Sequence, residues 1–213
     1  MRRFVLATVA ALALIILAGC SYSVKLNPNI DPTANIANKV PQRVGLFMPE
    51  EVKSFTIEDN SDWAHKYTFN IGEATSSIVS KSMSRVFATV ENLEAYPTQQ
   101  MIAERKIDLV AVPKITSAAV SLNQKSGFFQ DSATGNTQVS VQITFYSPDM
   151  TQLTAIQGSG MGVASKGMGA FTTGKGEYSS SVEDALRNLG DDLVHQTYGN
   201  YDIRKSTEAG QSK

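Results

Sequence analysis

The chain has 213 residues, 19 of them basic and 20 acidic, and a formal net charge of −1. No basic patch is interleaved with aromatic residues, so the composition gives no support to a nucleic-acid partner. A single cysteine, Cys20, excludes an intramolecular disulfide.

The amino-terminal segment has the layout of a secretory signal. Arg2 and Arg3 form a short positive region, and Phe4 to Leu17 is an uncharged apolar run. The run is about 14 residues long, whereas roughly 20 are needed to span a bilayer core. Small residues then precede Cys20, so we expect residues 1–19 to be a signal peptide that is removed on export.

The end of this leader, Leu17-Ala18-Gly19-Cys20, resembles the lipobox of bacterial lipoproteins. The resemblance implies that the Cys20 thiol is acylated with diacylglycerol and that its freed amine accepts a further chain. One acyl chain anchors a protein only marginally, whereas two or three on one residue hold it firmly. Ser21 implies, by the sorting rule of enteric-type lipoproteins, transport to the outer membrane, with inner-membrane anchoring as the alternative. Two competing interpretations of this segment are an ordinary cleaved signal followed by a chance cysteine and an uncleaved membrane anchor.

Removing Arg2 and Arg3 with the leader leaves 17 basic and 20 acidic residues, a formal charge of −3. The roughly 190 residues that remain are enough for one domain with a core. Residues 20–42 are expected to be the lipidated cysteine and a flexible tether, because Ser21 to Gln42 is polar and shows no periodicity. We expect a single periplasmic domain over 43–200 and a frayed polar tail over 201–213.

The domain is expected to begin with a buried strand, an irregular segment and a helix. Arg43 to Met48 is a short apolar run that Pro49 stops, which is typical of a buried strand. Glu50 to Tyr67 is polar and irregular. Asn70 can cap a helix whose apolar stripe runs to Phe87.

The middle of the chain predicts two strands around a short helix. Thr89 to Tyr96 has the pattern of a short strand, and Thr98 can cap a brief helix that ends at Arg105. Asp108 to Leu122 begins with an apolar run typical of a strand that is buried on both faces. Pro113 cannot donate a ladder hydrogen bond, so it is expected at a bulge or beside an unpaired edge.

The last third predicts two more strands and a long helix. Apolar and polar residues alternate from Val139 to Tyr146, which indicates a strand with one wet face. After a turn, Thr151 to Ser165 is expected to return as a strand. Ser180 and Glu183 form a capping box for the final helix. Its apolar stripe contains Val182, Ala185, Leu186, Leu189, Leu193 and Val194.

These elements predict an α+β fold: a mixed, largely antiparallel five-stranded sheet with two main helices and one short helix on one face. Their order, behind a lipobox and a polar tether, is similar to the amino-terminal domain of TolB and to the curli-export, Pel-polysaccharide and YajG-like lipoproteins. The similarity extends over roughly residues 43–198 and concerns element order, not diagnostic motifs. It therefore implies the fold more than the function. The long polar insertion before the first helix departs from that group.

Two glycine-rich stretches invite comparison with nucleotide-binding motifs. Gly169 to Gly176 nearly matches a phosphate-binding loop, but Gly176 stands where that loop needs a serine or threonine. Gly158, Gly160 and Gly162 lack the spacing of a dinucleotide-binding motif. We expect a flexible loop at the first stretch and a bulged or closely approached strand at the second.

No arrangement of residues indicates catalysis. His195 is expected at the surface of the last helix. His65 has acidic and aromatic neighbours at no recognisable metal-ligand spacing, which favours a solvated acidic loop. Those neighbours are Glu58, Asp59, Asp62 and Trp63. No serine or cysteine accompanies a histidine and a carboxylate in a recognisable pattern, so we expect no enzyme, no metal and no cofactor.

Two polar loops contain large apolar side chains: Phe128 and Phe129 within 123–137, and Met168 and Phe171 within 166–178. The strand directions place both loops at the same end of the sheet. We expect the four side chains to form a shared apolar tip, pointing away from the lipid anchor or toward a neighbouring subunit. Such a tip is a candidate contact surface for a membrane or a protein partner. The alternative is that the four side chains fold back over the edge of the core.

The sequence as a whole favours a non-catalytic periplasmic lipoprotein that acts by protein–protein contact in assembly or export across the outer membrane. The resemblance to the curli and polysaccharide export lipoproteins allows a homo-oligomer. A second possibility is a binding protein for a lipid or saccharide, with the glycine-bearing strand and the two loops as its mouth. An envelope hydrolase is a third, for which the sequence lacks a nucleophile.

Overall fold

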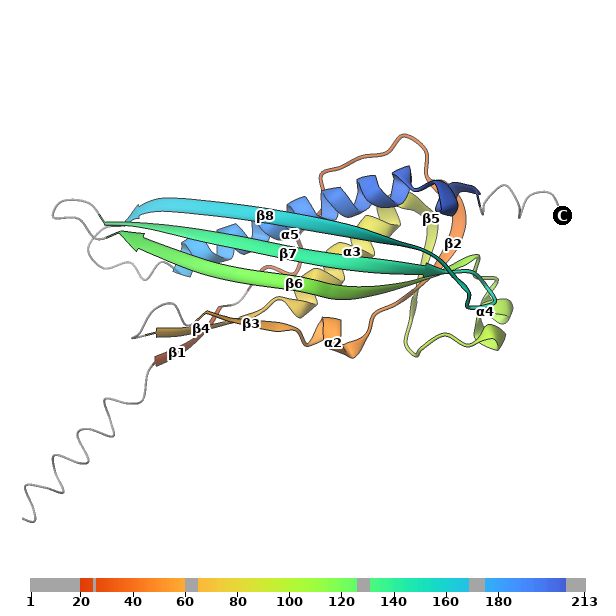
Figure 1. Cartoon of the computed structure of the whole chain (residues 1–213), viewed down its shortest axis with the longest axis horizontal. Coiled ribbons are helices and arrows are strands. Elements are labelled where there is room, and N and C mark those ends of the chain that lie inside the picture. Colours follow the sequence, from red (N-terminus) through yellow and green to blue (C-terminus); the bar gives the residue numbers. More distant parts are fainter. Residues whose placement is uncertain (1–19, 25, 60–64, 126–130, 169–174, 206–213) are drawn as a thin grey trace, which may run out of the picture.

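The computed structural model describes residues 20–24, 26–59, 65–125, 131–168 and 175–205. It confirms the α+β class: a five-stranded mixed sheet has the order β5-β2-β6-β7-β8, and helices pack on it (Figure 1). A three-stranded sheet with the order β1-β4-β3 accompanies it. The strands are β1 (Cys20–Val24), β2 (Val40–Phe47), β3 (Thr56–Asp59), β4 (His65–Asn70), β5 (Phe87–Leu93), β6 (Leu109–Lys125), β7 (Asp131–Tyr146) and β8 (Gln152–Met168). The helices are α2 (Glu50–Lys53), α3 (Gly72–Val86), α4 (Gln99–Arg105) and α5 (Lys175–Gly199).

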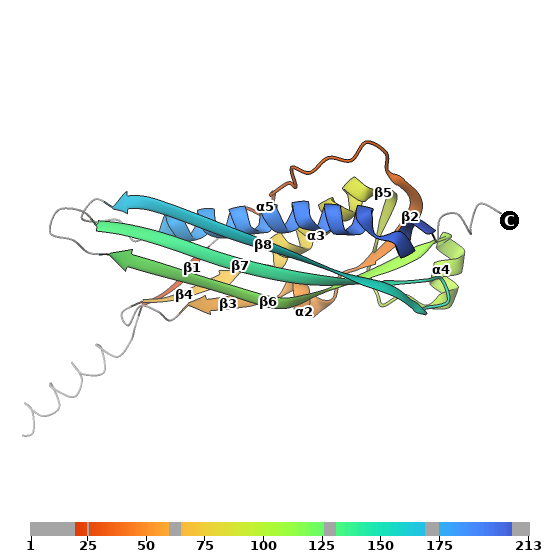
Figure 2. The ribbon, with the colours of Figure 1, turned by 45° about the horizontal axis from the view of Figure 1, so that its top comes forward.

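The larger sheet is parallel on one side and antiparallel on the other. β2 pairs in parallel with β5 and with β6, so the chain crosses from one side of β2 to the other between these strands. β6, β7 and β8 form an antiparallel meander that extends well past the parallel half (Figure 2). Beyond Ala111 no described strand pairs with β6 on the β2 side, so Pro113 lies beside an unpaired edge, as expected.

The main core lies between the larger sheet and the helices α3 and α5. Leu189 and Leu193, on the predicted stripe of the last helix, are both 0% exposed. The short helix α4 contributes to a second cluster in which Ile102 and Val110 are buried. Because side chains alternate along a strand, Val110 points to the face of β6 opposite to Leu109, which belongs to the main core. α4 therefore covers the other face of the sheet at this end.

The prediction that Glu50 to Tyr67 is irregular is wrong over most of this segment. It contains α2, β3 and the start of β4. β3 and β4 pair as an antiparallel hairpin, and Asp59 is only 6% exposed, so Glu58 and Asp59 do not belong to a solvated loop. Residues 60–64 lie outside the described chain.

One helix start was predicted correctly and two were not. The Thr98 hydroxyl accepts a hydrogen bond of 3.3 Å from the Met101 backbone N–H and caps α4. α3, in contrast, begins after Ile71, and no side-chain hydrogen bond caps it, so Asn70 is not its cap. α5 begins at Lys175, which places Ser180 inside the helix.

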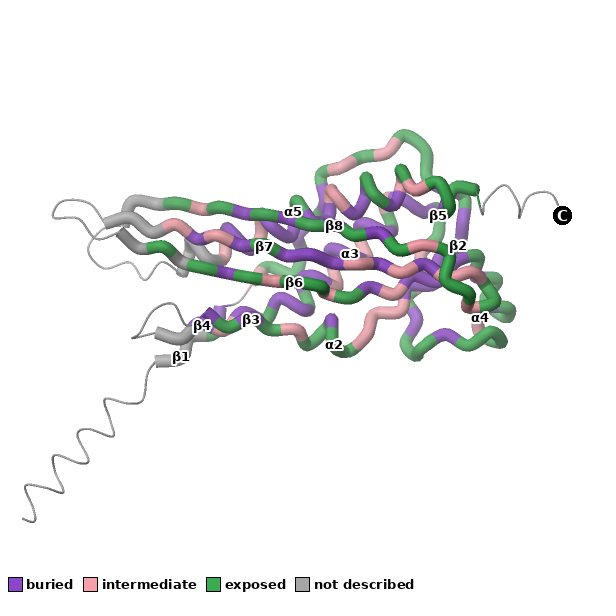
Figure 3. Tube along the Cα trace, viewed as in Figure 1, coloured by how far each residue is buried: buried purple, intermediate pink, exposed green. Residues whose placement is uncertain are grey.

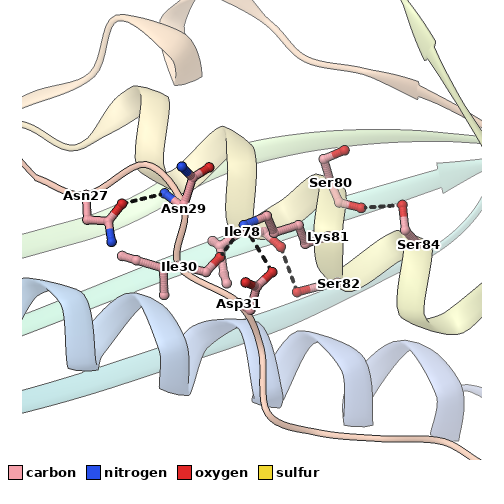
Figure 4. A network of polar contacts seen from close by, with 9 residues as sticks. All are labelled: Asn27, Asn29, Ile30, Asp31, Ile78, Ser80, Lys81, Ser82 and Ser84. Atoms are coloured by element: carbon pink, nitrogen blue, oxygen red, sulfur yellow. Dashed lines mark hydrogen bonds and ion pairs between the residues drawn. The ribbon is translucent and has the colours of Figure 1, made fainter.

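Residues 26–40, which we name the strap, pack on the domain, so the prediction of a flexible tether as far as Gln42 is wrong. Ile30 is 4% exposed and belongs to the main core, and Figure 3 shows buried positions along this segment. The Lys81 ammonium of α3 donates to the Ile30 carbonyl at 3.0 Å and pairs with Asp31 at 3.0 Å (Figure 4). On α5, Asp191 accepts the Ala34 backbone N–H at 2.7 Å. The strap thereby bridges both main helices.

Candidate functional site

Cys20, the predicted lipidation site, is the first residue of β1 and pairs with His65 of β4 in register. The two strands run parallel as far as Val24 and Phe69, both of which are buried in the main core. Cys20 is therefore itself part of the smaller sheet.

The predicted apolar tip lies largely outside the described residues, which omit Phe128, Phe129 and Phe171. Met168 is the last residue of β8 and pairs with Asp131, so it belongs to a strand and not to a loop. The strands that flank the two loops end together, as the topology predicted. Figures 1 and 2 place these strand ends toward the same end of the molecule as β1.

Three glycines of β8 face α5 at very short range. A methyl group at Gly160 would lie 1.9 Å from the Ala185 carbonyl oxygen, and one at Gly162 would lie 1.9 Å from the Ser181 carbonyl oxygen. The expectation of a closely approached strand is confirmed. The same contact shows that this face of β8 is filled by a helix, so the glycine-bearing strand is not the mouth of a binding site.

The opposite face of β6, β7 and β8, which we name the outer face, is turned to the viewer in Figure 1. On β8, Met161 is 64% exposed and Val163 is 61% exposed. Met161 pairs with Gln138 of β7, which in turn pairs with Ala119 of β6, so this row crosses three strands. No described helix lies over the row.

The outer face carries little charge. Between Asn136 and Thr144, its residues on β7 are Asn136, Gln138, Ser140, Gln142 and Thr144, and those paired with them on β6 and β8 are Val112, Lys114, Ser117, Ala119, Ser121, Ala155, Gln157, Ser159, Met161 and Val163. Lys114 is the one charged residue among these fifteen paired positions. Depletion of charge around exposed apolar side chains is a property of the centres of protein interfaces.

The free edge of β8 is partly closed by α5. The Ser159 backbone N–H donates to Asp192 at 2.8 Å, and the Met161 carbonyl accepts from the Asn188 amide at 2.7 Å. An edge strand whose backbone groups are already bonded is a poor template for an added strand. A partner would therefore use the face of the sheet here and not its edge.

At the other end of the meander, a tight turn joins β7 to β8. The Ser147 hydroxyl and then the Thr151 backbone N–H donate to Asp149, and they hold the pKa of that carboxyl below its usual range. Met150 adopts φ 65° in this turn, and its N–H donates to the Ser147 carbonyl at 2.9 Å. These bonds fix the turn and give no sign of chemistry.

A cavity of about 620 Å³ lies between α3 and the carboxyl ends of β2 and β5. Its walls combine polar side chains with a few apolar ones. They are Leu46, Met48, Lys53, Asn70, Glu73, Ser76, Ser77, Ser80, Asn92, Leu93 and Glu94. Sequence reasoning missed this cavity because its residues come from five elements, β2, α2, β4, α3 and β5, that are separate along the chain.

His65 is in β4, and His195 is exposed on α5. Within the described ranges, no group of three histidine, cysteine, aspartate or glutamate side chains is placed to hold a metal ion. None of the helices in the described part of the chain is long and apolar enough to cross a membrane.

No family model matches the sequence, and no curated protein matches it either. Solved structures do. A protein of the DUF330 family from Xanthomonas campestris is 11% identical, with a TM-score of 0.43, over 92% of this chain and 100% of that chain. A minor lipoprotein from Acinetobacter baumannii is 9% identical, with a TM-score of 0.40, over 76% of this chain and 95% of that chain. The PelC dodecamer from Paraburkholderia phytofirmans is 12% identical, with a TM-score of 0.31, over 74% of this chain and 94% of that chain. All three likenesses are at low identity, and one of the three proteins is named as a lipoprotein.

Proposed function

We propose that this protein is a non-catalytic lipoprotein, anchored by acylated Cys20 to the periplasmic face of the outer membrane. It acts there by protein–protein contact, as an accessory in the assembly or export of a polysaccharide, a fibre or a protein. We place it with the group of lipoproteins that resemble the TolB amino-terminal domain and the curli-export and YajG-like proteins. The partner is an envelope protein or a second copy of this chain.

The observation that carries this proposal is the outer face of β6, β7 and β8. Met161 and Val163, on the edge strand β8, are more than half exposed beside a nearly uncharged set of positions on β7 and β6. Contiguous exposed apolar patches rimmed by polar residues mark interaction sites, and the neighbouring Met161 and Val163 would form the centre of such a patch. The outer face lies on the side of the sheet away from α5, so a partner can reach it without disturbing the core.

The anchor is tested by Cys20→Ala. Because the thiol is the acyl acceptor, we expect the variant to lose all incorporation of labelled palmitate and to accumulate as precursor or as a soluble form. A matched Ser23→Ala variant, changed within the same strand, should label normally. Continued incorporation by Cys20→Ala would disprove the lipid anchor.

The contact surface is tested by Met161→Ser with Val163→Ser. Truncating an aromatic or apolar anchor at an interface hot spot costs ~2 kcal/mol or more, so we expect the native complex to dissociate while thermal unfolding changes little. The measurement is the native mass of the detergent-solubilised protein, together with the growth phenotype of cells that express it. Tyr201→Ser is the control, since Tyr201 is 70% exposed but lies on the carboxyl-terminal segment.

The predicted tip belongs to the same proposal. Serine at Phe128, Phe129, Met168 and Phe171 is expected to leave folding nearly intact and to abolish association and the phenotype. Earlier unfolding of this quadruple variant would assign the four side chains to the core. A stable variant that still supports function would show that partners bind elsewhere, with the outer face as the surface to be tested.

A further inference from the structure

The cavity beside α3 has the size and the position of a ligand site. Its volume of about 620 Å³ falls within the roughly 300–1,000 Å³ of small-molecule pockets. β2 runs parallel to both of its neighbours, β5 on one side and β6 on the other. In open α/β sheets, ligands bind outside the carboxyl ends of parallel strands. The cavity lies at the carboxyl ends of β2 and β5.

One side of α3 lines this cavity with serine residues. Ser76, Ser77 and Ser80 line it from successive turns of the helix. The Ser76 Oγ is buried and has no hydrogen-bond partner among the described residues. A buried hydroxyl is normally bonded, because leaving it unbonded costs free energy. The Asn70 and Asn92 amides add donors and acceptors to the same walls.

The charges around the cavity disfavour an anion. Glu73 and Glu94 both line it, and Lys53 is the one basic residue that does. Lys53 already lies 3.7 Å from Glu50. A phosphate or carboxylate would meet two carboxylates and a partly neutralised amine, so like-charge repulsion would oppose it. No aromatic side chain lines the cavity on which a nucleobase could stack.

We propose that this cavity binds a neutral, hydroxyl-rich ligand, namely a saccharide unit. Its hydroxyl groups both donate and accept, which matches walls that mix serine, asparagine and glutamate side chains. Leu46, Met48 and Leu93 offer apolar contacts for the C–H groups of the ring. This site is separate from the outer face, so it stands or fails independently of the proposed partner contact.

The test uses the whole lipidated protein in a detergent that has no sugar headgroup. Glucose, galactose and N-acetylglucosamine are each titrated to tens of millimolar while the backbone amide resonances of Ser76, Ser77 and Ser80 are followed by NMR. At least one sugar is expected to shift these resonances saturably. No saturable shift with any of the three overturns the proposal.

A charge series on one ring tests the class of ligand. Glucuronate and glucosamine each differ from glucose at one carbon: glucuronate carries an anionic carboxylate at C6, and glucosamine carries a cationic ammonium at C2. Glucuronate is expected to bind at least tenfold more weakly than glucose because it meets Glu73 and Glu94. Glucuronate binding as tightly as glucose, or glucosamine binding while no neutral sugar does, overturns the proposal.

A matched pair of variants locates the site. Ser77→Leu fills the cavity and is expected to weaken sugar binding at least tenfold. Ser84→Leu makes the same change on the same helix at an exposed residue that does not line the cavity, and it should bind as the unchanged protein does. Equal affinities for the two variants would place binding elsewhere. If Ser77→Leu unfolds, Ser77→Ala, with an expected threefold or greater loss of affinity, decides the question.

Discussion

Gly160→Ala is expected to lower the free energy of unfolding by about 3 kcal/mol. The added methyl group would lie 1.9 Å from the Ala185 carbonyl oxygen and 2.5 Å from the Leu189 nitrogen. Both atoms belong to the backbone of α5, so no rotamer change relieves the overlap, and the helix must move off β8. A domain is stable by only ~5–15 kcal/mol, so the loss should be visible in thermal or urea unfolding.

Ser159→Ala is the control for this change, because Ser159 adjoins Gly160 in β8 and its exposed side chain points to the outer face. Substitutions at such positions usually change stability by less than ~0.5 kcal/mol. If both variants unfold at the same denaturant concentration, α5 does not approach β8 as closely as the structure shows.

Leu193→Ala is expected to destabilise the protein by ~2–5 kcal/mol, because a fully buried leucine leaves a cavity when it is truncated. The neighbouring glycine makes this loss partly reversible. A methyl group at Gly158 would lie 2.6 Å from the Leu193 Cδ2 and 2.7 Å from its Cγ, atoms that Leu193→Ala removes. The double variant Gly158→Ala with Leu193→Ala should therefore be more stable than the sum of the single changes, by ~1 kcal/mol or more.

The pair Gly160 and Leu189, in which the glycine is two residues further along β8, should show no such rescue. Gly160 meets the backbone of α5, and Leu189→Ala leaves that backbone in place. Gly160→Ala and Leu189→Ala are thus expected to add, within ~0.5 kcal/mol, in the same unfolding experiment. Rescue in this pair, or its absence at Gly158 and Leu193, would contradict the packing of α5 on β8.

The sequence predicted those elements in which buried and exposed residues recur with the period of a helix or of a strand. The stripe through Leu189 and Leu193 and the alternation from Val139 to Tyr146 both follow the core directly. The smaller sheet had no such signal. β1 and β3 are five and four residues long, and β1 pairs with a strand more than forty residues away. Its pairing depends on tertiary contacts that no local pattern records.

The far half of the meander was missed for a related reason. Residues 123–137 are polar and contain glycine, which is typical of a loop, yet Asn123 pairs with Thr134 and Lys125 with Ser132. Here the backbone ladder holds the strands together without an alternating apolar face. The structure therefore extends β6, β7 and β8 beyond the residues that sequence periodicity can identify.

Of the candidate sites, the close approach at the glycines of β8 was predicted, whereas the outer face and the cavity were not. A signal for the outer face exists: Met161 and Val163 alternate with Gly160 and Gly162, so if the glycines face a helix, these two must face away. The cavity has no comparable signal. Its serines are ordinary residues of an amphipathic helix until β2 and β5 are placed beside them.

The pairing of β1 with β4 also determines how the proposed anchor carries mechanical load. Tension from the membrane would pull on Cys20 at the amino end of β1, while the body of the domain holds β4 through Asn70 and α3 at its carboxyl end. In a parallel ladder the hydrogen bonds are evenly spaced, and opposite pulls along the two strands load them in shear. All the bonds then resist together and do not peel apart one after another. Force applied at Cys20 would therefore be spread over the ladder between β1 and β4.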